Sequence, residues 1–253
     1  MSHDPTQRFS DRVDAYVRYR PGYPDQAVQW VLERAGLDQS GVIADVGSGT
    51  GIFTKPMLQH GHQVFAVEPN APMRTYAEQT LSGFEGFVSV NGSAEATALD
   101  GDSVDLVTAA QAYHWFANEE ARVEFVRILK PGGNVALLWN DRVTTGDPFH
   151  VEYESLLKEH ATDYERVNHQ NLDDTDFDRF FADGYECVSF DNAQRLSLDG
   201  LIGRAESSSY MPGAGHLGHA AMIDALIELF DRFSKQDMVV IAYQTTVRIG
   251  RVD

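Results

Sequence analysis

The sequence predicts an α/β fold, a doubly wound and mostly parallel sheet of seven strands with an antiparallel last strand and a helical cap or insertion. Short apolar runs alternate with helical patterns throughout residues 41–140. Such alternation implies right-handed crossovers between parallel strands that are covered on both faces. The final run, residues 238–250, instead alternates apolar and polar side chains, which is typical of an antiparallel partner.

Each element of the core has a local reason in the sequence. The first strand is a β-branched apolar run, as expected of a strand buried on both faces, and Asp25 is the expected N-cap of the helix before it. Core strands are expected at residues 41–46, 62–68, 87–92, 103–111 and 134–140. Helices are expected at residues 26–36, at 52–61, from Asn70 onward and at 118–130, the last with Val123, Val126, Ile128 and Leu129 largely on one side and a sharp stop at Pro131-Gly132-Gly133.

Beyond Asn140 the pattern is less regular. Residues 141–183 are polar, acidic and aromatic by turns and indicate a helical insertion with loops. Two late strands, at 185–192 and 238–250, flank an amphipathic helix at 221–233. We therefore expect one domain that comprises an N-terminal lid segment (1–24), a ligand-binding core (25–140), a substrate-cap insertion with loops (141–220) and a final helix and strand (221–253).

Composition excludes several classes of partner. The 253 residues include 38 Asp and Glu against 20 Lys and Arg, and the formal net charge of −18 disfavours binding to nucleic-acid backbones or anionic membranes. Cys187 is the only cysteine, so no internal disulfide can form. No signal peptide and no apolar run long enough to span a membrane are evident. We expect a cytoplasmic monomer or homodimer with small-molecule partners.

The stretch ADVGSGTG, residues 44–51, indicates a ligand that approaches the backbone closely. Gly47, Gly49 and Gly51 follow a G-x-G-x-G spacing rather than the G-x-G-x-x-G of a dinucleotide site. Glycines there can adopt positive φ and remove Cβ atoms that would hold a ligand away. Asp45 would repel a pyrophosphate and is better matched to a ligand that carries an ammonium group. An ordinary tight turn between strand and helix is the alternative.

Two further markers follow neighbouring strands. Glu68 ends the second strand, 23 residues after Asp45, where a carboxylate can accept both hydroxyls of an adenosine ribose. Enzymes that use NAD share this feature, so Glu68 does not distinguish a dinucleotide from a ligand that carries an ammonium group. Ser93, Ala94 and Glu95 follow the third strand, where their side chains and backbone could meet an adenine edge.

Together these residues resemble the class I S-adenosylmethionine-dependent methyltransferases, in the small-molecule group often called type 11. The resemblance covers about residues 40–140, with LKPGG at 129–133 as a further match. It implies a Rossmann-like methyltransferase fold and S-adenosyl-L-methionine as the cofactor. The cofactor-binding residues that it implies are Asp45, Gly47, Ser48, Gly49, Gly51, Glu68, Pro69, Met73, Ser93, Ala94, Glu95 and Gln111.

Two outer segments resemble a narrower subgroup, the trans-aconitate-methyltransferase-like proteins. They are YVRYRPGYP at residues 16–24 and AQAYHWF at residues 110–116, and the second implies a loop beside the transferred methyl group. Tyr19 and Arg20 are then expected over the cofactor, with Arg20 available for its carboxylate or for an acidic substrate. The alternative is that the first segment merely packs over the sheet. The expected substrate-binding residues are Tyr16, Tyr23, His114, Trp115, Arg204 and Tyr210.

The expected reaction is methyl transfer to a small molecule at a carboxylate or hydroxyl oxygen. His114 is the candidate catalytic base because an unperturbed histidine titrates near neutrality and because the loop that holds it is expected next to the methyl group. A packing role beside Trp115 is the alternative, and a carboxylate acceptor would need no base. Arg204 and Tyr210 belong to a polar, partly cationic set that could bind an anionic molecule. No metal site is expected, since the histidines show no HExxH or comparable ligand spacing and the pair His216 and His219 has a glycine, Gly218, between its members. The competing functions are an NAD-dependent oxidoreductase and a non-catalytic S-adenosylmethionine-binding protein.

Overall fold

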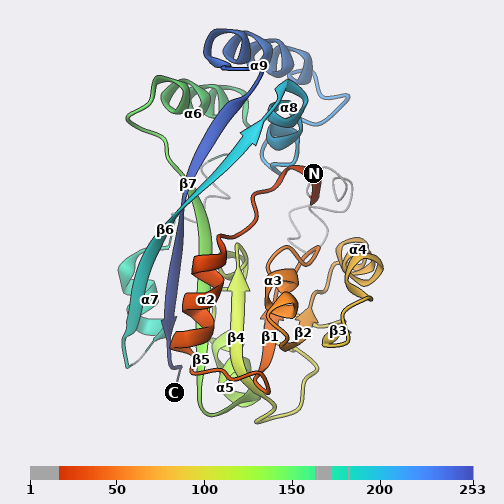
Figure 1. Ribbon diagram of the computed structural model, residues 1–253, viewed down its shortest axis with the longest axis vertical. Helices are drawn as coiled ribbons and strands as arrows, with labels where there is room; N and C mark the ends of the chain where they lie inside the picture. Colours follow the sequence, from red (N-terminus) through yellow and green to blue (C-terminus); the bar gives the residue numbers. More distant parts are fainter. Residues whose placement is uncertain (1–16, 163, 165–171, 182, 253) are drawn as a thin grey trace.

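One seven-stranded sheet organises the molecule (Figure 1). The computed structural model describes residues 17–162, 164, 172–181 and 183–252. The sheet has the strand order β3-β2-β1-β4-β5-β7-β6, and β7 alone runs opposite to the direction that the other six strands share. Its strands are β1 (Val42–Val46), β2 (Gln63–Val67), β3 (Phe87–Val90), β4 (Val104–Ala110), β5 (Leu129–Arg142), β6 (Tyr185–Leu196) and β7 (Val239–Gly250). The predicted fold class is confirmed.

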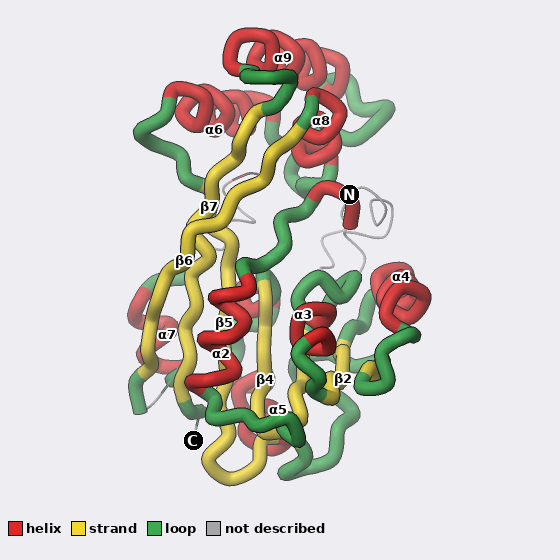
Figure 2. The backbone as a smooth tube through the Cα atoms, viewed as in Figure 1, coloured by secondary structure: helices red, strands yellow, loops and turns green. Residues whose placement is uncertain are grey.

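Helices cover both faces of the sheet (Figure 2). Successive β1 residues point to opposite faces. Ile43 belongs to the apolar cluster that contains Val28, Met57 and Leu81, and Ala44 belongs to the one that contains Phe125 and Phe177. No helix in the described ranges is both long and apolar enough to cross a membrane. The helices are α2 (Asp25–Arg34), α3 (Thr54–Gln59), α4 (Ala71–Leu81), the 3-10 turn η2 (Tyr113–Trp115), α5 (Glu119–Ile128), α6 (Pro148–His160), α7 (Asp174–Phe180), α8 (Leu198–Glu206) and α9 (His219–Phe233).

A cap stands on the long strands of the sheet. β5, β6 and β7 have 14, 12 and 12 residues, against 4 to 7 in the other strands. Their extensions rise beyond the core and carry α6, α8 and α9 (Figure 1). These helices bury their own apolar cluster, which includes Leu157, Leu201, Leu226 and Tyr243. The cap therefore has a core of its own and is tied to the rest of the molecule through continuous strands.

The predicted N-cap of α2 is wrong by one residue. Pro24 holds the N-cap position in an extended conformation, and its carbonyl accepts from the amides of Ala27 and Val28. Asp25 is instead the first helical residue, where the positive end of the helix dipole stabilises its carboxylate. Its side chain accepts a hydrogen bond from Gln29. Pro24 has no side-chain oxygen that could accept from the first helical amides, so only its backbone carbonyl caps α2.

The buried face of α5 also differs from the prediction. Val123 and Val126 are 57% and 40% exposed. The buried residues are Ala121, Glu124, Phe125 and Ile128, which follow the i, i+3, i+4, i+7 spacing of one helical face. A charged residue thus lies inside the stripe, because Glu124 accepts bonds from Thr97 and Arg127. Hydropathy alone favoured the valines and missed this paired glutamate.

The Pro131-Gly132-Gly133 segment does not separate helix from strand. α5 ends at Ile128, and residues 129–133 already belong to β5. The β4–β5 pairing contains a register shift between Val104 and Leu106 that accommodates this entry. Proline is tolerated at such an irregularity because the ladder does not need a backbone N–H donor there. The strand therefore starts five residues earlier than expected.

Candidate functional site

A cavity of about 350 Å³ opens at the carboxyl ends of β1, β2 and β4. The chain leaves β1 toward β2 and reaches β4 on the other side, which makes this edge the topological switch point where α/β sheets bind ligands. The N-terminal segment and α8 close the cavity from the cap side. Predicted site residues that line it are Arg20, Tyr23, Asp45, Gly47, Ser48, Gly49, Glu68, Pro69, Met73, Ser93, Ala94, Glu95, Gln111, Trp115 and Arg204.

The glycine turn adopts the predicted conformation. Gly47, Gly49 and Gly51 have φ values of +70°, +58° and +84°, and the amides of Gly47 and Ser48 both donate to the Val67 carbonyl. A Cβ on Gly47 would lie 2.7 Å from Cβ of Ala112, closer than unbonded carbons can approach. The turn therefore needs glycine both for its backbone and for the packing of the loop after β4.

Glu68 presents a held carboxylate to the cavity. Its Oε2 accepts from the Gly49 amide and its Oε1 from the Asn70 amide, each at 2.8 Å. Burial raises the pKa of this carboxyl, against the two amide bonds that lower it. Each oxygen keeps acceptor capacity beyond its backbone donor. The arrangement is suited to receiving two hydroxyl groups from a ligand.

Asp45 adds a second buried acid, only 1% exposed. Thr108 donates to its Oδ1 at 2.9 Å and Thr54 to its Oδ2 at 2.6 Å. Burial raises the pKa of Asp45 to about 6, although both threonine bonds lower it. Asp45 also raises the pKa of Glu68, so the two charges act on one another. This side of the cavity favours a ligand with a positive charge.

Two hydroxyl groups of the glycine turn have no hydrogen-bond partner among the described residues. Ser48 Oγ and Thr50 Oγ1 are buried, line the cavity and find no hydrogen-bond partner among the residues that the structure describes. An unsatisfied buried hydroxyl costs about 1–3 kcal/mol, which a polar ligand would offset. Thr50 was not predicted, although its place between two glycines of the motif could have indicated it. Other lining residues that sequence reasoning missed include Phe53, Asn70, Phe116 and Asn140.

The cap side of the cavity carries the opposite charge. Arg20 lines it and donates to the Ser207 carbonyl at 2.9 Å, and Arg204 lines it from α8. Trp115 supplies an aromatic face from the loop after β4, and Tyr23 packs edge to face on Phe53 at 4.8 Å between centroids. A ligand in this cavity thus meets carboxylates from the core and guanidinium groups from the cap side.

Four predicted residues lie outside the cavity lining: Gly51, Tyr19, His114 and Tyr210. A Cβ on Gly51 would meet Leu81 at 2.5 Å, so this glycine serves packing against α4. The ring of His114 lies 4.9 Å from that of Trp115, and its Nδ1 accepts from the indole N–H of Trp139 at 3.5 Å. Tyr210 belongs to a polar cluster in the cap. Tyr16 lies outside the described residues.

The N-terminal segment is fastened to the cap and the long strands. The side-chain amides of Asn140 and Asn192 both donate to the Gly22 carbonyl, and Gln194 donates to the Tyr19 carbonyl at 3.0 Å. The Tyr19 ring lies directly on Gly203 of α8, where a Cβ would come within 2.1 Å of it. These contacts fix the position from which Arg20 reaches the cavity.

Comparison with known proteins agrees with this geometry. A family model described as a methyltransferase domain matches residues 44–137. An uncharacterised methyltransferase-like protein of Schizosaccharomyces pombe is 38% identical over 141 residues, which is 54% of this chain and 53% of that protein. An uncharacterised methyltransferase of Mycobacterium tuberculosis is 38% identical over 139 residues, 55% of this chain and 54% of its own length. The chain thus spans about half the length of these curated relatives.

Solved structures share the fold. A protein from Anaeromyxobacter dehalogenans, provisionally named a type II methyltransferase, superposes with a TM-score of 0.69 at 22% identity and covers 92% of this chain and 98% of its own. Phosphoethanolamine N-methyltransferase 2 of Haemonchus contortus was solved with phosphomonomethylethanolamine and S-adenosylhomocysteine. It superposes with a TM-score of 0.53 at 16% identity and covers 97% of this chain and 58% of its own.

Within the described ranges, no group of three or more His, Cys, Asp or Glu could hold a metal ion.

Proposed function

We propose, from the premise that residues 44–137 belong to the class I S-adenosylmethionine-dependent methyltransferases, that the whole chain methylates a small molecule at a carboxylate or hydroxyl oxygen. The observation that carries the proposal is the convergence of two buried carboxylates, the glycine turn and an aromatic loop on one cavity. The family match favours this function over an NAD-dependent oxidoreductase. The narrower resemblance to trans-aconitate-methyltransferase-like proteins remains part of the proposal.

The residues present fit S-adenosylmethionine. Glu68 has acceptor capacity for the ribose hydroxyls, and Asp45 places negative charge where the amino-acid part of the cofactor would carry its ammonium group. The buried hydroxyls of Ser48 and Thr50 offer further polar contacts. By resemblance, Ala94 and Glu95 would meet the adenine.

The protein contributes alignment and exclusion of water. When bound, S-adenosylmethionine would supply an electrophilic methyl group on sulfur, with S-adenosylhomocysteine as its leaving group. Correct orientation of two reactants can supply about 7–11 kcal/mol. Trp115 and Phe116 line the cavity and present aromatic rings, which favour a nearby cation by about 0.5–2 kcal/mol.

A general base is not required if the acceptor atom is a carboxylate oxygen, because that group is already ionised at neutral pH. A hydroxyl acceptor must lose a proton, and we propose His114, which lies next to the lining residue Trp115, as the general base for it. Its Nδ1 accepts from Trp139 and its ring lies beside Trp115, contacts that support a positioning role for the loop. We place the acceptor under the cap insertion, residues 141–220, and propose that the protein works as a monomer or homodimer on small molecules only.

Methyl transfer tests the proposed function directly. The full chain is incubated with S-adenosylmethionine labelled in the methyl group and a panel of small carboxylic acids, phenols and alcohols. We expect label in one class of acceptor, with one S-adenosylhomocysteine released per methyl group transferred. The activity should disappear in Glu68→Gln and persist in Glu85→Gln, an exposed acid on the loop before β3. A protein that binds the cofactor but labels nothing would support the non-catalytic alternative.

A further inference from the structure

Helix α5 carries a buried carboxylate that reaches across to the loop after β3. Glu124 is 8% exposed and lies in the buried stripe of α5. Its Oε1 accepts from the amide and the hydroxyl of Thr97 at 2.8 and 2.5 Å, and Arg127 donates to both of its oxygens at 2.7 Å. The bonds from Arg127, and then those from Thr97, lower the pKa of Glu124 to about 2 against burial, which raises it. The carboxylate is therefore ionised at neutral pH.

Thr97 directly follows a turn that borders the cavity, residues 93–96. Ser93 and Ala96 close this turn with reciprocal backbone bonds of 3.1 and 3.3 Å. Ser93, Ala94 and Glu95 line the cavity, whereas Thr97 is fully buried behind them. The bonds between Thr97 and α5 thus fix one end of the 93–96 turn.

The backbone just beyond Thr97 is strained. Ala98 has a φ of +62°, in the left-handed region that residues with a Cβ rarely adopt. Thr97 on one side is bonded to Glu124, and the Leu99 carbonyl on the other side accepts from Arg127 at 2.8 Å. A strained residue persists only where the surrounding contacts over-determine its conformation. The pair of Glu124 and Arg127 therefore holds the loop in a shape that its own backbone does not favour.

Asn118 makes a second contact between α5 and the 93–96 turn. It is the N-cap of α5, where its Oδ1 accepts from the Ala121 amide, and its Nδ2 donates to Glu95 Oε1 at 3.0 Å. Burial raises the pKa of Glu95, but the bond from Asn118 and bonds within the turn bring it below its usual value. The Asn118 amide also donates to the carbonyl of Phe116, a lining residue, at 2.8 Å. Asn118 thus joins the loops that follow β3 and β4.

We propose that Glu124 and Asn118 are positioning residues that make the 93–96 turn selective for adenine. This inference rests on the proposed function, because it takes the purine of S-adenosylmethionine as the ligand of this turn. The edge of adenine presents an amino group that donates and a ring nitrogen that accepts, whereas hypoxanthine presents an oxygen and an N–H in the reverse pattern. A turn held in one conformation distinguishes the two patterns, and a loosened turn can adapt its polar groups to either.

The test compares S-adenosylhomocysteine with S-inosylhomocysteine, which differ at this edge of the purine, by calorimetric titration of the full chain. We expect the wild type to bind the adenine form at least about tenfold tighter. Glu124→Leu keeps an apolar side chain in the stripe of α5 but removes the acceptor for Thr97, and it should lower this preference to about threefold or less. Asn118→Asp keeps an oxygen that can cap α5 and removes the donor to Glu95. It should lower the preference while the stability is retained.

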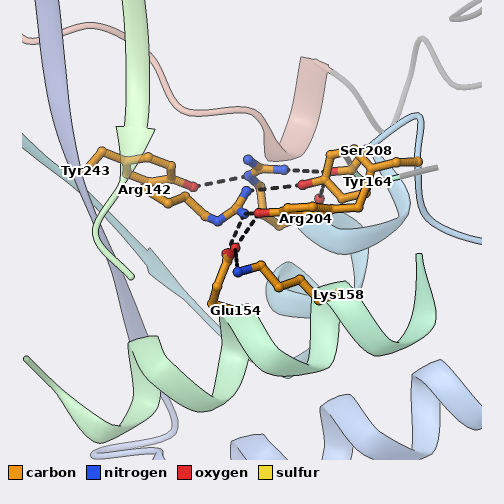
Figure 3. Close-up of polar contacts among 8 residues, drawn as sticks. Arg142, Glu154, Lys158, Tyr164, Arg204, Ser208 and Tyr243 are labelled. Carbon is orange, nitrogen blue, oxygen red and sulfur yellow. Dashed lines mark hydrogen bonds and ion pairs between the residues drawn. The ribbon is translucent and has the colours of Figure 1, made fainter. Parts of the chain in front are cut away.

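The matched control is Glu154→Leu. Glu154 is a buried glutamate of α6 that pairs with Arg142 and Lys158 at 2.8 and 3.4 Å in the cap (Figure 3). This variant also takes a buried carboxylate from an arginine, so it should lower the stability measured by urea unfolding. The preference for adenine should stay within about twofold of the wild type, because distant sites act independently.

The preference for adenine separates a positioning role from a purely structural one. A preference that stays at the wild-type value in both variants of α5, or that falls equally in Glu154→Leu, would overturn the proposal. If circular dichroism shows that Glu124→Leu is unfolded, Thr97→Val takes its place, since it removes one of the two Thr97 bonds and leaves Glu124 paired with Arg127. A wild-type chain that binds both ligands equally would overturn this inference alone, whereas one that binds neither would overturn the proposed function itself.

Discussion

Asp45 places a carboxylate at the cavity, and its burial lowers the stability of the protein without a ligand. Its carboxyl is buried at the end of β1 between two threonine hydroxyls, with no cationic side chain bonded to it in the described residues. Burial therefore raises the pKa from its ordinary value of 3.8 to about 6. The folded chain keeps this proton over a range of pH in which the unfolded chain has lost it. Ionised Asp45 consequently destabilises the free protein at neutral pH.

The prediction at this scale concerns Asp45→Asn. Between pH of about 4 and 6 the folded state binds more protons than the unfolded state, so the contribution of Asp45 to the free energy of unfolding falls as pH rises, by roughly 3 kcal/mol in all. Asp45→Asn should remove this part of the pH dependence, raise the stability of the free protein at neutral pH and weaken cofactor binding. Urea unfolding of both proteins across that pH range measures it. Identical pH dependence in the two proteins would rule out the assigned pKa.

At the scale of elements, the contact between the N-terminal segment and α8 decides how Arg20 reaches the cavity. The Tyr19 ring occupies the space that any side chain at Gly203 would need. Gln194 of β6 holds the Tyr19 carbonyl, and Arg20 bonds to the Ser207 carbonyl just beyond α8. Bonds to β6 and to the end of α8 thus position Tyr19 and Arg20.

We predict that Gly203→Ala displaces this segment. Alanine favours a helix by about 1 kcal/mol over glycine, but its Cβ would collide with the Tyr19 ring. Affinity for S-adenosylhomocysteine should fall while the far-ultraviolet circular dichroism is retained, and Tyr19→Ala added to Gly203→Ala should relieve the collision without restoring full affinity. Gly200→Ala, in the same helix with its closest side-chain contact at 3.2 Å, is the control. Unchanged affinity in Gly203→Ala would show that the segment does not shape the site.

The core could be predicted from the sequence because its signals are local. The β1 run, the glycine turn and Glu68 lie within 27 residues, and each motif specifies its own backbone. The cap could not, because its contacts join distant residues. Arg204 bonds to Tyr243 and Arg20 to the Ser207 carbonyl, and neither pair follows a helical or strand period. α8 itself was missed, since Gly200 and Gly203 weaken its helical pattern.

At the scale of the whole molecule, the acidic and cationic sides of the cavity come from different parts of the chain. The core provides Asp45 and Glu68 within the segment that the methyltransferase family model matches. The N-terminal segment and the cap provide Arg20 and Arg204 from outside it. We propose that the core segment binds the donor and the cap the acceptor, so cofactor binding can be tested without knowledge of the acceptor.

Glu68→Gln is the variant that identifies the donor site within such a test. Both carboxylate oxygens accept from backbone amides, whereas glutamine has one oxygen and would direct its NH₂ group at a second donor. The variant should lose most of the stabilisation by S-adenosylhomocysteine, which is measured as the change in melting temperature on adding ligand. Glu85→Gln, with an exposed side chain before β3, should retain it.

The most direct measurement is the melting temperature of the wild-type chain with and without S-adenosylhomocysteine. Ligand at one hundred times its dissociation constant stabilises a folded protein by about 2.7 kcal/mol, which for a chain of this size raises the melting temperature by about 5–10 °C. We predict a rise of that size in the wild type and its loss in Glu68→Gln. No rise at millimolar ligand would contradict the assignment of this cavity to S-adenosylmethionine.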